Sequence, residues 1–199
     1  MKILPTTPAP SAVTPSLVDF GNTLTPALGG SEQRINRLGN RFRLSVTMPP
    51  MQNKEQGMKF VNRLVRGRSE GLRMKFPLSG FNPGTPGSPA VDGANHAGRL
   101  LDVAGFTPGY QIKEGQFFSI ETDGQHYLYM IDADNSSSTG APYGANLVIN
   151  PMLRIPPSDG DICHFAQPMI EGLIEGSETQ WNYALDYNVG IEFTIKERR

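Results

Sequence analysis

The sequence predicts a mostly β protein, α+β only in a minor way, whose compact core is a β-barrel or split barrel accompanied by one amphipathic helix. Its 199 residues include 22 glycines and 17 prolines, a proportion typical of turn-rich β proteins rather than helical bundles. Short segments that alternate apolar and polar residues recur between turn signals, and a single segment has the period of a helix. Apolar residues make up 38% of the chain, which is enough to build a core.

The first 30 residues are predicted to form an extended arm. They contain five prolines, each of which fixes φ and removes a backbone donor, so a regular helix does not fit here. A mobile terminus is one interpretation. The interpretation we favour is an arm that packs on another surface, such as a neighbouring copy of the chain. Residues 31–199 are predicted to be a single β domain.

The first regular elements follow the arm. Residues 41–48 alternate basic or polar with apolar residues, which predicts a half-buried strand closed by Pro49-Pro50. Residues 53–66 change to a helical period, with Asn53 as the expected N-cap and Gly67 as the expected stop. The apolar stripe expected to face the core consists of Met58, Val61, Leu64 and Val65.

Residues 76–170 are predicted to be an inserted small β subdomain. A loop at residues 76–89, rich in Pro, Gly and Ser, opens it, and Asp123-Gly124 is a strong hairpin signal within it. Short strands at this spacing favour a small barrel or sandwich. The expected strands are Arg99–Val103, Gln116–Glu121, Gln125–Ile131, Ala145–Ile149 and Ile162–Ala166.

Residues 190–197 alternate strictly and are predicted to form the closing strand. Ile191, Phe193 and Ile195 are expected to face the core, while Glu192 and Lys196 face outward. We expect this strand to pair with residues 42–48. Glu192 would then lie opposite arginines of that strand, which is a favourable cross-strand match.

Charge is distributed unevenly along the chain although the formal net charge is only −1. Residues 34–75 carry a net charge of +9, and residues 76–199 carry −9. This division fits either nucleic-acid contact by the basic half or contact between basic and acidic surfaces of neighbouring copies. Few aromatic residues interleave with the basic ones, so DNA binding is disfavoured as the main activity. The candidate subunit-interface residues are Arg34, Arg37, Arg41, Arg43, Lys59, Arg63 and Arg66.

No catalytic constellation is visible, so we expect no enzymatic activity, cofactor or metal. The single cysteine, Cys163, excludes an intramolecular disulfide and is expected to be a buried, inert thiol. His96, His126 and His164 lie in three separate segments, and none has a partner four residues on, so each is interpreted as an ordinary imidazole. Residues 132–136 superficially resemble a calcium loop, but the glycine at the sixth position and the glutamate at the twelfth are missing.

The chain shows no signal for export or membrane insertion. The apolar run after Lys2 ends at Pro5, too short for a signal peptide, and no stretch approaches the roughly 20 apolar residues of a membrane span. We therefore expect synthesis in the cytoplasm and no membrane insertion.

From about residue 40 to the end, several segments follow one another in a distinctive order and spacing. They are Leu44–Met51, Gly93-Ala94 with Gly98, Leu101–Gly105, Ile112–Ile120, Ala145–Arg154, Pro157–Gly160 and Gly190–Phe193. This order resembles the phage distal tail protein family, the ring components of long, non-contractile tails. One feature departs from the family: Gln116 stands where an Asp is usual.

The resemblance implies a structural virion protein: a ring, typically of six identical subunits, that joins the tail tube to the tail-tip or baseplate complex. It also implies neighbours, namely the tail tube protein, the tape measure protein and the tail-tip hub protein, with DNA only passing through the lumen. The protein would be assembled in the host cytoplasm and located at the tail tip of the virion. A ring of this kind uses heterologous contacts, for which opposite charges on two parts of one chain are suited.

Two other functions are considered. One is a carbohydrate-binding module at the tail tip involved in host adsorption, based on Trp181, Tyr183 and Tyr187, whose rings could stack on sugars. The other is a split-barrel enzyme that binds a flavin or another cofactor, which rests on fold analogy alone.

Overall fold

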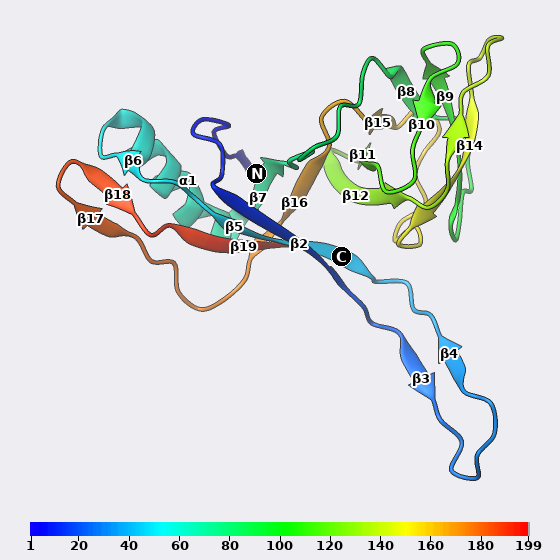
Figure 1. Ribbon diagram of the computed structural model, residues 1–199, viewed down its shortest axis with the longest axis horizontal. Coiled ribbons are helices and arrows are strands. Elements are labelled where there is room, and N and C mark those ends of the chain that lie inside the picture. The colour runs from blue at the N-terminus through cyan, green and yellow to red at the C-terminus, as the bar shows by residue number, and fades with distance from the viewer. Residues whose placement is uncertain (199) are drawn as a thin grey trace.

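The computed structural model describes residues 1–198 and is mostly β with one α-helix, which confirms the predicted fold class. It has two parts, a six-stranded sheet covered by the helix and a closed six-stranded barrel (Figure 1). Two hairpins project from these parts. Within residues 1–198, no helix is both long and apolar enough to cross a membrane.

The six-stranded sheet is built from both ends and the middle of the chain. Its order is β1-β7-β16-β19-β5-β2, and all neighbours are antiparallel except β1 and β7. Both edge strands come from the predicted arm, so the arm packs on its own chain over residues 2–18. The strands are β1 (Lys2–Ile3), β2 (Ala12–Val18), β5 (Arg41–Thr47), β7 (Leu72–Lys75), β16 (Met169–Ile174) and β19 (Glu192–Glu197).

The predicted closing strand forms as β19 and pairs antiparallel with β5, as expected. Phe193 and Ile195 are buried beside Val46 and Leu44, their cross-strand partners. The expected ionic match is wrong, however, because Glu192 lies opposite Thr47 rather than an arginine. The register is fixed by burial of the apolar side chains, and a shift that brought an arginine to Glu192 would misplace every one of those pairs.

Helix α1 (Glu55–Glu70) differs from the prediction at both ends and in its buried face. Its N-cap is Lys54 rather than Asn53, and it continues through Gly67 and ends at Gly71. Gly67 is retained inside the helix because a Cβ there would lie only 3.1 Å from the Leu72 side chain on β7. Glycine therefore allows the helix to pack closely on the sheet at this position, where a Cβ would press on the Leu72 and Ile174 side chains.

The buried face of α1 is formed by two glycines and two large apolar residues, rather than by the predicted stripe. Met58 and Val65 are 59% and 45% exposed, so of the predicted residues only Leu64 is buried and Val61 is partly buried. The stripe is rotated because Phe60, the largest side chain of the helix, occupies the core together with Leu64. The buried residues are Gly57, Phe60, Leu64 and Gly67.

The barrel occupies the chain between β7 and β16, within residues 76–170. Asp123 and Gly124 both have positive φ, 51° and 74°, and form the expected two-residue hairpin turn. The first barrel strand begins at Gly87, inside the segment predicted as a loop. Pro89 is tolerated there because the pairing of this strand is irregular between Gly87 and Ala90. In barrel order the strands are β11 (Phe117–Thr122), β12 (Gln125–Ile131), β14 (Ala145–Asn150), β9 (Leu100–Phe106), β8 (Gly87–Val91) and β15 (Ile162–His164). A small sheet of β10 (Gln111–Ile112) and β13 (Asn135–Ser136) lies beside it.

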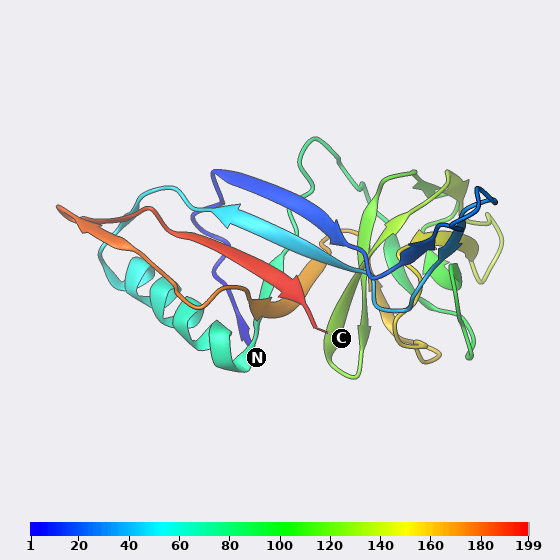
Figure 2. The same cartoon turned by 90° about the horizontal axis from the view of Figure 1, so that it is seen from below.

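Two hairpins extend from the body at different places (Figures 1 and 2). The first, β3 (Asn22–Leu24) and β4 (Gln33–Ile35), joins β2 to β5 and reaches away from the sheet. The second, β17 (Asn182–Ala184) and β18 (Tyr187–Val189), pairs with the short β6 (Met51–Gln52) at the end of the molecule where α1 begins.

The barrel and the sheet share a packed seam. Leu128 on β12 is fully buried in the core of the sheet rather than in that of the barrel. Beside it, the Glu197 carboxylate of β19 accepts hydrogen bonds from the backbone N–H groups of Phe42 and Leu128 and pairs with Arg154. Strands of both parts are therefore held together by apolar and ionic contacts.

Candidate functional site

The seven basic residues predicted at a subunit interface do not form one patch. They fall into three groups on different elements, and the helix group lies on the far side of the sheet from β3 and β4 in Figure 1. Arg34 and Arg37 are on or just after β4, Arg41 and Arg43 are on β5, and Lys59, Arg63 and Arg66 are on α1.

Four of these residues form ion pairs within the chain. Arg34 pairs with Asp19, and on the helix Lys59 and Arg66 pair with the acidic residues four positions away. Arg43 pairs with Glu175 at 3.1 Å. Four of the seven cations are therefore paired within the chain, two of them with acidic residues of the same basic stretch.

The other three residues make different contacts. The Arg41 guanidinium lies 4.8 Å from the centre of the Phe20 ring, a cation–π contact. Arg63 donates a hydrogen bond to the carbonyl oxygen of Ile3 at 2.6 Å and so ties α1 to β1. Over residues 1–198, Arg37 makes no hydrogen bond or ion pair, which leaves it available to a partner.

Exposed apolar side chains gather on the β3–β4 hairpin and its flanks. Leu28 in the turn is fully exposed, and Leu38 is 62% exposed. Leu24 and Ile35 on the strands are also exposed. An isolated two-stranded hairpin is marginally stable in water, and grouped exposed apolar residues mark interaction sites. The predicted end of the arm at residue 30 falls inside the turn of this hairpin, so neither the hairpin nor its apolar surface was predicted.

The three aromatic residues considered for sugar stacking are not arranged as one platform. Trp181 is partly buried against the core of the sheet. Tyr183 lies opposite Asn188, and Tyr187 lies opposite Ala184, so the two tyrosines point to opposite faces of the β17–β18 hairpin. Leu185 in the turn is 92% exposed, which makes this hairpin tip a second apolar projection.

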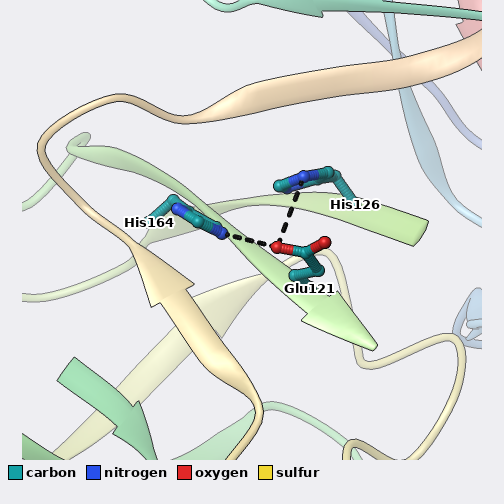
Figure 3. Close-up of side chains that lie close together, drawn as sticks. All are labelled: Glu121, His126 and His164. Atoms are coloured by element: carbon teal, nitrogen blue, oxygen red, sulfur yellow. Dashed lines mark hydrogen bonds and ion pairs between the residues drawn. The ribbon is translucent and has the colours of Figure 1, made fainter. Parts of the chain in front are cut away.

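A separate cluster lies on the outer wall of the barrel, where Glu121, His126 and His164 converge from β11, β12 and β15 (Figure 3). His164 Nε2 is 3.1 Å from Glu121 Oε2, and His126 Nε2 is 3.7 Å from the same oxygen. The two imidazole ring centres are 4.8 Å apart. His126 is almost completely buried, whereas the other two side chains are about one-third exposed.

The surroundings of His126 hold its ring in place and keep its imidazole uncharged. Its Nδ1 lies 3.4 Å from Ser119 Oγ, which itself accepts a hydrogen bond from the backbone N–H of Met169. Burial, together with the positive charge of Arg73, lowers the pKa of His126 to about 4. The imidazole is therefore neutral at neutral pH. The charge of Arg73 is balanced by Glu171 at 2.6 Å.

Only part of this cluster could have been read from the sequence. The Asp123-Gly124 turn places Glu121 directly opposite His126 in the hairpin, so that pair follows from the turn type. The spacing of four residues that marks two zinc-binding histidines on a helix does not apply to this cluster, because its residues lie on strands. His164 carries no such signal, because β15 joins β11 through a pairing far apart in sequence.

The remaining predicted groups have partners or are enclosed. Cys163 is buried in the barrel core, as expected for an inert thiol, and burial raises the pKa of its thiol. Asp132 and Asp134, from the segment compared with a calcium loop, pair with Arg99 and Lys113.

An apolar cavity of about 330 Å³ lies beside Phe60 and the N-terminal prolines, with Lys75 as the one charged residue in its lining.

Comparison of the chain with protein-family models finds no model that matches, and comparison with curated proteins finds no significant match.

Proposed function

We propose that this protein is a structural subunit that assembles with identical copies into a ring at the distal end of a phage tail, joining the tail tube to the tail-tip complex. The observation that carries the proposal is the projecting β3–β4 hairpin, which exposes apolar side chains and has no core of its own. The resemblance of the segment order to distal tail proteins supplies the biological setting.

Burial of the hairpin against another copy explains its composition. Leu24, Leu28, Ile35 and Leu38 lose contact with water only if another surface covers them. Covering an apolar side chain stabilises by about 1.5–3 kcal/mol, which gives the contact a driving force. Arg37, without a partner in its own chain, adds a charge that an acidic surface of the neighbour can match.

The placement of the two hairpins favours a ring over a two-fold dimer. They project from different places on the body, so each meets a different surface of a neighbour (Figures 1 and 2). Such heterologous contacts close into rings when the rotation between subunits allows it. The ring would hold six copies and would contact the tube, tape measure and hub proteins, with DNA passing through its lumen. On this proposal the protein is a non-enzymatic part of the virion.

The test is the mass of the purified assembly, measured by light scattering during size-exclusion chromatography. We expect a species about six times the 21.7 kDa of one chain. The double variant Leu28→Asp/Leu38→Asp should be monomeric, because it places charges on the apolar surface of the hairpin. The control is Leu100→Asp, which makes the same kind of change at a barrel leucine about as exposed as Leu38 and should still assemble.

A density map of intact tails should then show the ring at the distal end, with each β3–β4 hairpin seated on an adjacent subunit. A wild-type chain that stays monomeric at high concentration and does not join tail particles would contradict the proposal. If the double variant and the control assemble equally well, the β3–β4 hairpin is not part of the contact between subunits.

Carbohydrate binding at the tail tip is the alternative. It has less support, because Trp181 is partly buried in the core and the two tyrosines face opposite ways. Binding on a glycan array that is lost in Tyr183→Ala would favour it.

A further inference from the structure

We propose that Glu121, His126 and His164 form a binding site for a divalent transition metal ion, with Zn²⁺ as the expected occupant, on the barrel wall that faces the sheet. The site lies within one chain and is independent of the proposed ring function.

The donor atoms suit zinc. Two imidazoles and one carboxylate are a common set of three protein ligands for zinc, leaving a fourth position open. With bonds of about 2.0–2.2 Å, a tetrahedral ion holds its ligand atoms about 3.3–3.5 Å apart. The two distances from Glu121 Oε2, 3.1 and 3.7 Å, lie on either side of this value. All three ligand atoms are within 4.8 Å of one another, so small side-chain movements complete the geometry.

The backbone places these side chains together without strain. Glu121 lies opposite His126 on β12, and its other neighbour, Ile162, is two residues from His164 on β15. Because side chains alternate along a strand, all three point to the outer face of the barrel, while Ile120 and Cys163 point into its core. The site is therefore fixed by three hydrogen-bonded strands rather than by a loop.

A hydrogen-bonded ion pair alone does not account for the arrangement. His164 and Glu121 satisfy one another at 3.1 Å, but the 3.7 Å from His126 Nε2 is too long for a hydrogen bond. Among residues 1–198, His126 Nε2 makes no hydrogen bond, whereas Nδ1 faces Ser119 Oγ. Metal-ligating histidines typically bind through one ring nitrogen and hold the other by a hydrogen bond of this kind.

The charges nearby tolerate a dication. Glu121 contributes one negative charge, and the nearest cation, Arg73, is paired with the buried Glu171. The ion would lie where β11 and β12 meet β16, since Glu171 also accepts a hydrogen bond from the backbone N–H of His126. Its effect would be to link β11, β12 and β15 and to stiffen the wall of the barrel at the seam with the sheet.

The experiment uses the full chain without a histidine tag, freed of metal by a chelator and titrated with Zn²⁺ by calorimetry and with Co²⁺ by visible absorption. We expect one equivalent of Zn²⁺, a Co²⁺ spectrum of the intense four-coordinate type, and a Tm that rises with Zn²⁺. Glu121→Gln and His164→Gln, both at partly exposed positions, should each weaken Zn²⁺ binding by at least about 10- to 100-fold.

The matched control is His96→Gln, which removes a histidine in a separate turn and should leave binding unchanged. Far-UV circular dichroism and elution volume identify any variant that fails to fold; the inference then rests on the other ligand variant. Unchanged affinity in a folded ligand variant, equal loss in His96→Gln, or no saturable binding by the wild-type chain would each overturn the inference.

Discussion

At the scale of single residues, the Glu197 carboxylate is a buried charged group that needs several compensating contacts. Only 1% of its side chain is exposed, and 2% of that of its partner Arg154. Burial raises the pKa of Glu197, while the charge of Arg154 and the N–H groups of Leu128 and Phe42 act in the opposite direction. The carboxylate thus connects β19, β5, β12 and the segment after β14, at the seam between sheet and barrel.

Replacing Glu197 with alanine should therefore be strongly destabilising. The change leaves the buried guanidinium of Arg154 without its ionic partner and two backbone donors without an acceptor, and breaking one side of a buried pair costs about 3–5 kcal/mol. The measurement is the free energy of unfolding in urea. Glu55→Ala, which removes the acidic partner of an exposed helix pair, serves as the control and should leave stability unchanged. A Glu197→Ala variant within about 1 kcal/mol of wild type would contradict this view of the pair.

The inward direction of Glu197 could have been predicted. It continues the period-two series of Ile191, Phe193 and Ile195, so the alternation itself points the carboxylate at the core. Its partners could not be predicted, because Arg154 is 43 positions away and the contact depends on how the barrel packs on the sheet.

At the scale of elements, pairing between local neighbours was easier to predict than the faces and edges that depend on distant contacts. The β11–β12 hairpin follows directly from the Asp123-Gly124 turn. The buried face of α1 does not follow from its apolar residues. Gly67 lets the helix lie close to Leu72 of the sheet, Gly57 lets it lie close to Gln52 of β6, and Phe60 faces inward. Likewise, nothing local indicates that β1 and β2 supply the two edges of one sheet.

Close approach of backbones also determines one strand position, Gly172 on β16. A Cβ there would overlap the carbonyl oxygen of Lys196 on β19 and lie 2.8 Å from the Cα of Glu197. Gly172→Ala should destabilise the protein by at least about 2–3 kcal/mol, because backbone must move to make room. Thermal unfolding followed by circular dichroism measures the effect.

Gly140→Ala is the control for this substitution. A Cβ at Gly140 meets nothing within 4 Å, and its backbone is not in the left-handed region, so stability should be unchanged or slightly improved. Equal Tm values for the two variants would show that β16 and β19 are not as closely packed as described.

At the scale of the whole molecule, the division into barrel and sheet was foreseeable, whereas the surfaces that meet partners were not. The barrel strands follow one another along the chain, so the turn residues between them indicate where most of these strands begin and end. The net charge of +9 on residues 34–75 suggested a basic face, but the folded chain pairs five of the eleven cations internally, as Arg43 does with Glu175. The exposed apolar residues on the two hairpins, with Arg37 beside the first of them, are the surface left for partners, and their grouping becomes visible only when the whole fold is assembled.

These hairpins give the final prediction, a pattern of limited proteolysis that depends on assembly. Leu28 and Leu185 occupy the two hairpin turns and are 101% and 92% exposed, so chymotrypsin should cut there first in the dissociated chain. Ring assembly should protect Leu28, because the β3–β4 hairpin is then covered by a neighbour. Leu100 is an internal control: it is 64% exposed but lies in a hydrogen-bonded barrel strand, so it should resist cleavage in both states. Mass spectrometry of the fragments locates the cuts, and equal cleavage at Leu28 in both states would mean that the hairpin is not buried between subunits.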